Sequence, residues 1–377
     1  MTDVLVVGAG PAGAVAATIL ARAGVAVRLV DRARFPRDKF CGDTLNPGVV
    51  RLLHGLRLAG TVVQAAARID GMLVTGPGGV RVQARYRAGR DGRALLRKDF
   101  DASLLQHALA AGAQVEEHVH VRAPIVEETR EGMTVRGVTA RGRDGRTCSL
   151  RARVTIAADG RRSAVVAAVG LGRTSSFQRW AAGAYFSDVE GLTSSGEMHI
   201  RGSGYIGVAP IAPNYTNVCV VTNNSVEAAN PAALVQSTLR DDPVLCDRFR
   251  RARPVSRFVS MGPLARDVVG AGMPGLLLAG DAAGFVDPMT GDGLRFAVRG
   301  GALAAEAAQR MLGGGRDAHT WLARRRRREF WRKYTLDRVL RWLVASPQAL
   351  TLATIGARVA PWTIETLVRI AGDEQLS

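Results

Sequence analysis

Two glycine-rich segments, far apart in the chain, carry the residues best suited to chemistry. Residues 8–13 read GAGPAG, and residues 280–294 read GDAAGFVDPMTGDGL. Glycines at such turns let a backbone approach a phosphate, and a helix that begins there offers unpaired N–H groups to the anion. An Asp at the end of a strand can bond a sugar hydroxyl. Together the two segments predict one bound dinucleotide that carries a flavin.

The first segment lies inside a complete βαβ unit. Residues 4–7 predict a buried strand, the Ala-rich stretch after Gly13 predicts a helix, and a second strand closes on Asp31. In such a unit Gly8 permits the tight turn, Gly10 lets the backbone approach a pyrophosphate, and Gly13 lets the helix pack on the strand. Asp31 would bond a ribose hydroxyl and disfavours a 2′-phosphate, which favours FAD or NAD over NADP.

The second segment decides between these dinucleotides. Residues 275–284 predict a buried strand that ends in Gly280-Asp281, and the turn at 291–293 opens an Ala-rich helix over about 294–311. Asp281 can bond a ribityl hydroxyl there, and the helix N-terminus can stabilise negative charge on a reduced isoalloxazine. NAD has no ribityl chain, so FAD is the predicted cofactor.

Two shorter motifs fit the same cofactor. A helix predicted over 100–111, with an acidic cap, would aim Arg97 at a phosphate or at the flavin edge. Asp159-Gly160 ends another predicted strand and returns a carboxylate and a glycine to the nucleotide region.

Two stretches predict antiparallel sheet. Residues 115–156 alternate apolar and polar side chains around a turn at 142–146, which is typical of a small meander. Residues 205–210 and 217–221 predict a hairpin around a turn at 213–214.

The order of these motifs resembles that of flavoproteins with the p-hydroxybenzoate hydroxylase fold. The motifs are GAGPAG with Asp31, Arg97 in RxxFDxxL, Asp159-Gly160 and Gly280-Asp281. Within that group, FPRDKFCGDTLNPG at 35–48, together with residues 280–294, is similar to the geranylgeranyl reductase family, and the resemblance spans about residues 1–315. It implies a discontinuous FAD domain, a substrate domain built on a larger sheet, and redox chemistry at the flavin.

The expected fold is therefore α/β, with a Rossmann-like FAD-binding domain that carries the GxGxxG, DG and GD segments. An α+β substrate domain and a helical C-terminal cap complete it. The FAD-binding domain would comprise 1–70, 95–165 and 262–315, the substrate-binding sheet 71–94 and 166–261, and the helical region 316–377.

The expected cofactor site combines the glycine turns, the strand-end acids and the segment that follows the first βαβ unit. Its residues are Gly8, Gly10, Pro11, Ala12, Gly13, Asp31, Arg32, Lys39, Cys41, Gly42, Asp43, Arg97, Val121, Asp159, Gly160, Gly280, Asp281, Pro288, Gly291, Gly293 and Leu294. In geranylgeranyl reductases the KxCG segment borders the flavin ring, which implies that Cys41 lies at the active site. Its thiol would donate a proton to a substrate carbon or pack as a small apolar group.

The predicted hairpin supplies the expected substrate residues Tyr205, Gly207 and Pro210. The reductases commonly read YxWxFP here, so Gly207 in place of Trp predicts a differently shaped pocket. The expected reaction is hydride transfer from reduced FAD to a C=C bond of a hydrophobic, lipid-, isoprenoid- or polyketide-like molecule. NAD(P)H is the expected external donor, with a ferredoxin as the other candidate. Two alternatives stay open. One is an FAD-dependent monooxygenase that hydroxylates an aromatic or polyketide substrate through a flavin hydroperoxide, and the other is a flavin-binding protein without turnover.

Composition limits the partners. The net charge is +18, but only three residues are lysines, and the arginines are spread along the chain without a zinc spacing, a helix-turn-helix or an aromatic-basic platform. A nucleic-acid partner is therefore not expected. Four cysteines without CxxC spacing predict neither disulfides nor a metal site. His118 and His120 share a face of a predicted strand, without acids or cysteines to complete a metal site.

The ends of the chain bear on location. The first residues enter a strand directly, which leaves no room for a signal peptide, so a cytoplasmic protein is expected. Arg324–Arg328 lie on a predicted helix that continues with aromatic and apolar residues. Such a helix can lie on the anionic inner face of a membrane, or it can cap the substrate domain with solvated arginines. Residues 343–357 are apolar but too short to span a bilayer. No pattern indicates an oligomeric state.

Overall fold

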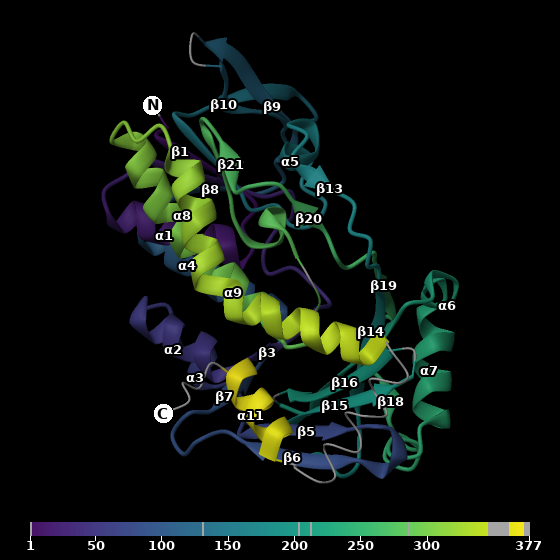
Figure 1. Ribbon diagram of the computed structural model, residues 1–377. Helices are drawn as coiled ribbons and strands as arrows, with labels where there is room; N and C mark the ends of the chain where they lie inside the picture. Colours follow the sequence, from purple (N-terminus) through teal and green to yellow (C-terminus); the bar gives the residue numbers. More distant parts are fainter. Residues whose placement is uncertain are drawn as a thin grey trace.

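The computed structural model describes residues 2–129, 132–202, 204–211, 213–285, 287, 289–345 and 362–372. Two large β-sheets organise these residues, one toward the top and one toward the bottom of Figure 1. The first is a 6-stranded sheet in the order β21-β22-β12-β1-β2-β8, and the second is an 8-stranded sheet. The fold is α/β, as the sequence predicts.

The first sheet is parallel except at one edge. Its strands are β1 (Val4–Val7), β2 (Val27–Val30), β8 (Gln114–Glu116), β12 (Val154–Ala157), β22 (Leu276–Leu278) and the antiparallel edge strand β21 (Gly272–Met273). β1 and β12 are fully buried, because both faces of this sheet are covered, and their continuous apolar runs fit that position.

Helices cover one face of the first sheet and a small sheet covers the other. The helices α1 (Pro11–Arg22), α4 (Arg97–Ala110) and α8 (Gly293–Leu312) bury their Ala-rich sides against one face. The antiparallel strands β9 (His120–Thr129), β10 (Gly132–Arg141) and β11 (Thr147–Arg151) pack on the other face together with α5 (Ala164–Ala168).

The predicted meander is present as β9, β10 and β11, but its predicted ends are wrong. Residues 114–116 pair in parallel with β2, and residues 154–157 pair in parallel with β1. Both stretches therefore belong to the first sheet, because they pair with its buried parallel strands. In sequence they lie on either side of the meander. The alternation that predicts the meander holds only between them.

The second sheet has the order β18-β14-β17-β16-β15-β5-β6, with β19 also paired to β14. Its strands are β5 (Gly71–Thr75), β6 (Arg81–Arg85), β14 (Trp180–Ser187), β15 (Ser195–Arg201), β16 (Gly204–Ile211), β17 (Tyr215–Thr222), β18 (Arg253–Pro254) and β19 (Val259–Met261). The predicted hairpin is β16 and β17, which pair from Gly204↔Thr222 to Ile211↔Tyr215. Helices α6 (Ser225–Ala229) and α7 (Pro231–Asp241) cover one face of this sheet (Figure 1).

Short elements complete the fold. They are a sheet of β3 (Thr44–Leu45), β7 (Gly92–Ala94) and β4 (Ala67–Ile69), the pair β13 (Gly172–Arg173) and β20 (Asp267–Val268), the helices α2 (Pro47–Gly55) and α3 (Thr61–Gln64), and the 3-10 turns η1 (Pro77–Gly79) and η2 (Gly280–Ala283). The division into an FAD-binding and a substrate-binding domain stays a prediction.

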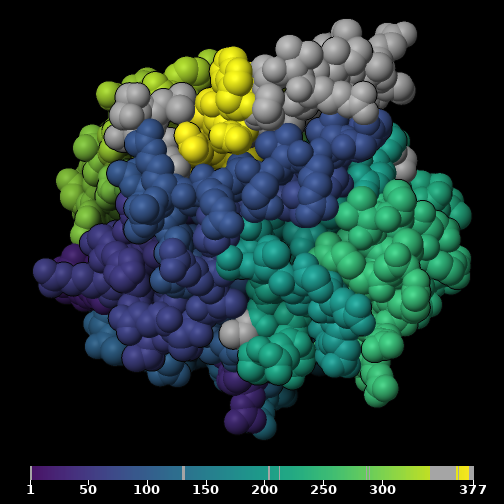
Figure 2. All heavy atoms as spheres, turned by 90° about the horizontal axis from the view of Figure 1, so that it is seen from below, coloured from purple at the N-terminus to yellow at the C-terminus, as the bar shows by residue number. Residues whose placement is uncertain are grey.

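The described C-terminal residues are helical, as predicted. The long helix α9 (Ala318–Ala345) packs along α8 and over β21 and β22. The helix α11 (Trp362–Ala371) packs on β6, and Figure 2 shows it in yellow against the blue surface of the preceding strands. Most of the apolar run at 343–357 lies outside the described residues. None of the described helices combines the length and the apolar character needed to cross a bilayer.

Candidate active site

A cavity of about 150 Å³ lies between the helix starts of the first sheet and the strands of the second. Its wall comes from eight parts of the chain that are separated in sequence. The lining residues are Gly10, Pro11, Ala12, Lys39, Cys41, Gly42, Thr44, Arg97, Ala158, Gly160, Arg161, Ala181, Cys219, Met261, Leu264, Gly280, Asp281, Phe285, Gly291, Gly293, Leu294 and Ala297. Both glycine-rich segments singled out from the sequence therefore meet at one cavity.

The two segments meet because α1 and α8 cross at very short distance. A Cβ on Gly301 of α8 would lie 2.3 Å from the carbonyl oxygen of Ala12, and a Cβ on Gly280 would lie 2.9 Å from Ala12 Cβ. Within the first turn, a Cβ on Gly13 would lie 1.8 Å from the carbonyl oxygen of Gly8. Neither helix has a side-chain cap at its start, so both positive ends face the cavity.

Two of the strand-end acids, Asp31 and Asp159, surround the first turn without lining the cavity, whereas Asp281 lines it. Asp31 accepts hydrogen bonds from the backbone N–H of Ala9 at 2.7 Å and of Ala33 at 2.8 Å. Asp159 accepts from the N–H of Ala164 at 3.2 Å through Oδ2, whereas its buried Oδ1 accepts no hydrogen bond from a described residue. Burial raises the pKa of Asp159. The uncapped start of α1 offers N–H groups that fit a pyrophosphate, and the unused Oδ1 of Asp159 offers an acceptor that fits a sugar hydroxyl. Both features fit a bound dinucleotide.

Most of the predicted cofactor residues line the cavity. Those that do not are Gly8, Gly13, Asp31, Arg32, Asp43, Val121 and Asp159. Gly8 and Gly13 lie inside the first turn and shape it. Val121 lies two residues after Val119, whose N–H donates to the Asp31 carbonyl oxygen at 2.9 Å. Pro288 lies outside the described residues.

Arg97 lies on the cavity wall in a buried ion pair. Its Nε and Nη2 donate to the two carboxylate oxygens of Asp101, each at 3.0 Å, and Arg37 approaches the same carboxylate at 3.1 Å. The helix α4 begins at Arg97, earlier than the predicted residue 100. The prediction is wrong because the cap comes from elsewhere in the chain: Asp43 accepts from the Arg97 N–H at 3.0 Å.

Asp43 joins the Cys41 segment to the second sheet. The side-chain amide of Asn217 in β17 donates to Asp43 Oδ2, and it also donates to the Cys41 carbonyl oxygen at 3.2 Å. Burial raises the pKa of Asp43 to about 7, against the opposing effect of its hydrogen bonds with Asn217 and Tyr185. Asn217 lies in the predicted hairpin, but an Asn on an alternating strand gives no sign of a partner so far away in sequence.

Two thiols and several apolar side chains form the wall beyond the helix starts. Cys41 lines the cavity together with five residues that are not predicted from the sequence, namely Ala181, Cys219, Met261, Leu264 and Phe285. Burial raises the pKa of Cys219 to about 12, so it stays a thiol. The pKa of Lys39 is lowered, first by the charge of Arg97 and then by burial. The cavity therefore has a charged glycine-lined end and an apolar end.

The turn at the start of α8 is held by residues from outside the predicted site. The side-chain amide of Asn46 donates to Asp292 Oδ1 at 3.1 Å, and Lys333 of α9 pairs with the same carboxylate. Thr290 donates to Asp337 of α9 at 2.7 Å. Only the fold brings these positions together, so no local motif could have predicted them.

The predicted substrate residues lie behind the cavity wall. Tyr205 is 4% exposed and donates its hydroxyl to Asp287 at 2.9 Å, and Asp287 lies 3.6 Å from Arg179. A Cβ on Gly207 would have only the Cys219 carbonyl oxygen near it, at 3.8 Å, so a larger side chain would find space there. Pro210 is half-buried. None of the three lines the cavity.

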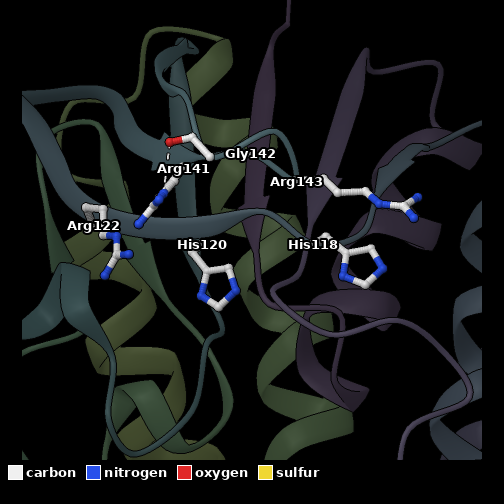
Figure 3. Close-up of a pocket in the computed structure, with 7 residues that line it drawn as sticks. His118, His120, Arg122, Arg141, Gly142 and Arg143 are labelled. Atoms are coloured by element: carbon white, nitrogen blue, oxygen red, sulfur yellow. Dashed lines mark hydrogen bonds between the residues drawn. The ribbon is translucent and has the colours of Figure 1, made fainter.

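His118 and His120 line a separate hollow on the surface of the β9–β10 sheet (Figure 3). Arg122, Arg141 and Arg143 line it with them, and its volume is about 400 Å³. Among the described residues no group of His, Cys, Asp or Glu side chains could hold a metal ion. The hollow is therefore a basic surface. Its three arginines, Arg122, Arg141 and Arg143, are called the hairpin arginines below.

Comparison with known protein families also indicates a protein that binds FAD. The model of a family described as "FAD binding domain" matches residues 1–332. The chain is thus an FAD-dependent oxidoreductase with a fold of the p-hydroxybenzoate hydroxylase type.

Curated relatives narrow the family. The chain is 32% identical over 317 residues to digeranylgeranylglycerophospholipid reductase 2 of Methanopyrus kandleri, covering 81% of this chain and 76% of that protein. It is 30% identical over 328 residues to menaquinone reductase of Mycobacterium tuberculosis, with 81% and 76% covered. The chain belongs to the geranylgeranyl reductase family of flavoproteins.

Solved structures share the fold at lower identity. A flavin-dependent brominase superposes with a TM-score of 0.84 at 22% identity, covering 98% of this chain and 93% of that one. A flavoprotein/dehydrogenase from Cytophaga hutchinsonii superposes with a TM-score of 0.74 at 24% identity, with 83% and 79% covered. At such identities the likeness concerns the fold alone.

Proposed function

We propose that this oxidoreductase reduces a C=C bond of a hydrophobic lipid-, isoprenoid- or polyketide-like molecule. The composition of the cavity carries this proposal: a charged end built from two helix starts meets an apolar end built from Ala181, Met261, Leu264 and Phe285. An apolar wall binds an apolar chain by burying its surface and excludes water from the reacting carbon. The names of the two relatives, which are reductases of a glycerophospholipid and of menaquinone, support a lipid substrate.

The charged end is the proposed FAD site. The N-terminus of α1 at Gly10 would bind the pyrophosphate, and Asp31 would bind the ribose. Asp281 would bind the ribityl chain, and the N-terminus of α8 would stabilise negative charge on the ring. When bound, the reduced cofactor supplies hydride to the substrate from its N5 atom.

The carbon that does not receive hydride needs a proton, and Cys41 is the proposed donor. Its thiol lies on the cavity wall, and its backbone is fixed by the hydrogen bond from Asn217. Cys219 lines the same cavity but is a much poorer donor, because burial raises its pKa to about 12. The proposal thus separates two thiols of one cavity by their environments.

We also propose NAD(P)H as the external electron donor, because a hydride donor returns both electrons to the flavin in one step. Mixing the oxidised holoprotein with NADH, NADPH or dithionite under anaerobic conditions tests this. Bleaching of the flavin by dithionite alone would exclude both nicotinamide donors.

The reaction type is tested by the mass of the product. Pre-reduced holoprotein is mixed with polyprenyl lipids, menaquinone or polyketide-like aromatics, first without and then with oxygen, and the products are analysed by mass spectrometry. Gain of one H₂ per double bond without oxygen is the expected result. A product that gains one oxygen atom, and only when O₂ is present, would replace the reductase by a monooxygenase. Flavin that turns over with none of these substrates would leave the proposal without support and favour a binding protein.

A further inference from the structure

The exposed side of α9 carries one sign of charge. Its exposed residues recur every three or four positions, which places them on one side of a helix. They are Arg324, Arg327, Arg328, Trp331, Arg332, Thr335, Arg338 and Val339, and we call them the α9 face. Between residues 324 and 339 the face is about 22 Å long at 1.5 Å per residue.

The acids of α9 are turned away from this face. Glu329 lies 3.6 Å from Arg295 and 3.3 Å from Arg299, both in α8. Asp337 is 1% exposed and accepts from Thr290. None of the five arginines of the α9 face forms an ion pair with a described residue. Their charge is therefore available to a partner.

The predicted run of five arginines is divided between two sides of the helix. Arg326 is 6% exposed, donates to the Ala283 carbonyl oxygen at 3.3 Å and stacks 5.6 Å from the Phe330 ring centre. Arg325 is half-buried and lies over the ring of Trp321. The inward side of α9 thus packs on the rest of the protein. Of the five arginines in the run, Arg324, Arg327 and Arg328 lie on the outward side.

Apolar surface accompanies the outward arginines. Trp331 is 53% exposed and Val339 is 47% exposed. An exposed Trp among arginines is poorly explained by solubility alone. Trp favours the boundary between water and lipid, where its ring is in an apolar layer and its N–H is in a polar one.

We propose that the α9 face docks on the surface of an anionic phospholipid bilayer. The arginines would pair with lipid phosphates, and Trp331 and Val339 would enter the headgroup layer. The contact is peripheral, because no described helix can cross a bilayer. It delivers the protein to the phase in which a lipid substrate resides. Docking is measured without turnover, so its failure and failure of the proposed reaction are separate results.

The test is sedimentation of the FAD-loaded protein with vesicles of phosphatidylcholine that contain phosphatidylglycerol. The face variant carries Arg324→Gln, Arg328→Gln and Arg332→Gln. The matched control carries Arg122→Gln, Arg141→Gln and Arg143→Gln in the hairpin arginines (Figure 3), which are also exposed, and it removes the same number of charges.

Wild type and control are expected to bind with similar affinity, whereas the face variant loses about a hundredfold, since each arginine near an anionic surface contributes about a fivefold change. Binding should weaken as salt rises. Trp331 fluorescence, obtained as the difference from Trp331→Phe, should shift to the blue on binding.

Two results would overturn the proposal. Equal loss in the face variant and in the control would show that net charge alone attracts the vesicles. Absence of vesicle binding, with tight binding of a single-stranded oligonucleotide that depends on Trp331, would assign the face to nucleic acid.

Discussion

Lys333 of α9 and Asp292 at the start of α8 form a buried ion pair, with 3.1 Å between Nζ and Oδ1. The two side chains are 5% and 1% exposed. Lys333 Nζ also donates to the carbonyl oxygens of Ile370 at 2.9 Å and Ala371 at 2.6 Å in α11. One ammonium group therefore joins both C-terminal helices to the turn at 291–293 on the cavity wall.

Lys333→Met should destabilise the protein by about 3–5 kcal/mol, because it leaves the carboxylate of Asp292 buried without its cation. The same change should weaken FAD binding, since the turn at 291–293 loses its support. Chemical unfolding and flavin fluorescence titration measure the two effects. Arg332→Met, at an exposed neighbouring position, should change neither quantity, and Lys333→Arg should recover part of both. FAD affinity that stays at the wild-type value in Lys333→Met would show that the pair supports the fold alone.

Gly13→Ala should abolish FAD binding. The added Cβ would lie 1.8 Å from the Gly8 carbonyl oxygen, so the turn must open where the pyrophosphate is expected. The absorbance of bound flavin after gel filtration is the measurement. Gly55→Ala is the matched control, because a Cβ at that helical position meets nothing within 4 Å. A Gly13→Ala protein that keeps stoichiometric flavin would contradict the assignment of the turn.

Asp43 should make the protein less stable as pH rises from about 4 to about 7. Burial raises the pKa of its carboxyl from 3.8 to about 7, so in this window the folded state holds a proton that the unfolded state has released. The free energy of unfolding falls through the window by ~4 kcal/mol from this group and is level above it.

Subtraction isolates this effect from that of Asp337, whose pKa is also raised to about 7, chiefly by burial. The difference between wild type and Asp43→Asn, followed by urea unfolding at several pH values, should slope downward from pH 4 to 7. Asp241→Asn, which removes one exposed carboxyl, is the matched control. A flat difference for Asp43→Asn would mean that the carboxyl has an ordinary pKa.

Cys41→Ser should leave FAD bound and slow alkene reduction, by roughly tenfold to a hundredfold if the thiol is a general acid. Cys219→Ala in the same cavity should change the rate much less, because its thiol is not the proposed donor. Single-turnover oxidation of the pre-reduced flavin by substrate gives both rates. Equal, small effects of the two substitutions would reduce Cys41 to a packing residue.

Continuous motifs made the core of the fold predictable. The first βαβ unit, the helix after Gly293 and the hairpin of β16 and β17 each depend on neighbouring residues, and each agrees with the structure. Prediction was weaker at element ends. α4 starts earlier than expected because Asp43 caps it from outside its own sequence.

Contacts between distant segments could not be predicted. Asn217 of the second sheet bonds to Asp43 in the segment before β3, and Lys333 reaches Asp292 from a helix beyond the resemblance. The apolar wall of Met261, Leu264 and Phe285 was also missed, because its members come from short strands and loops without a period. Sequence therefore predicts which cofactor is bound better than it predicts what surrounds the substrate.

The close crossing of Ala12 and Gly301 has a consequence during synthesis. The turn at residues 8–13 is synthesised early. The helix α8, which completes the cavity, begins only at Gly293, so almost the whole stretch covered by the family resemblance is synthesised in between. At ~5–20 residues per second, the ribosome needs roughly 15–60 s to span that interval, during which the Ala-rich side of α1 lacks its partner. We expect FAD loading to be a late event, so nascent chains arrested before Gly293 should not retain the cofactor, whereas chains that extend through α9 should.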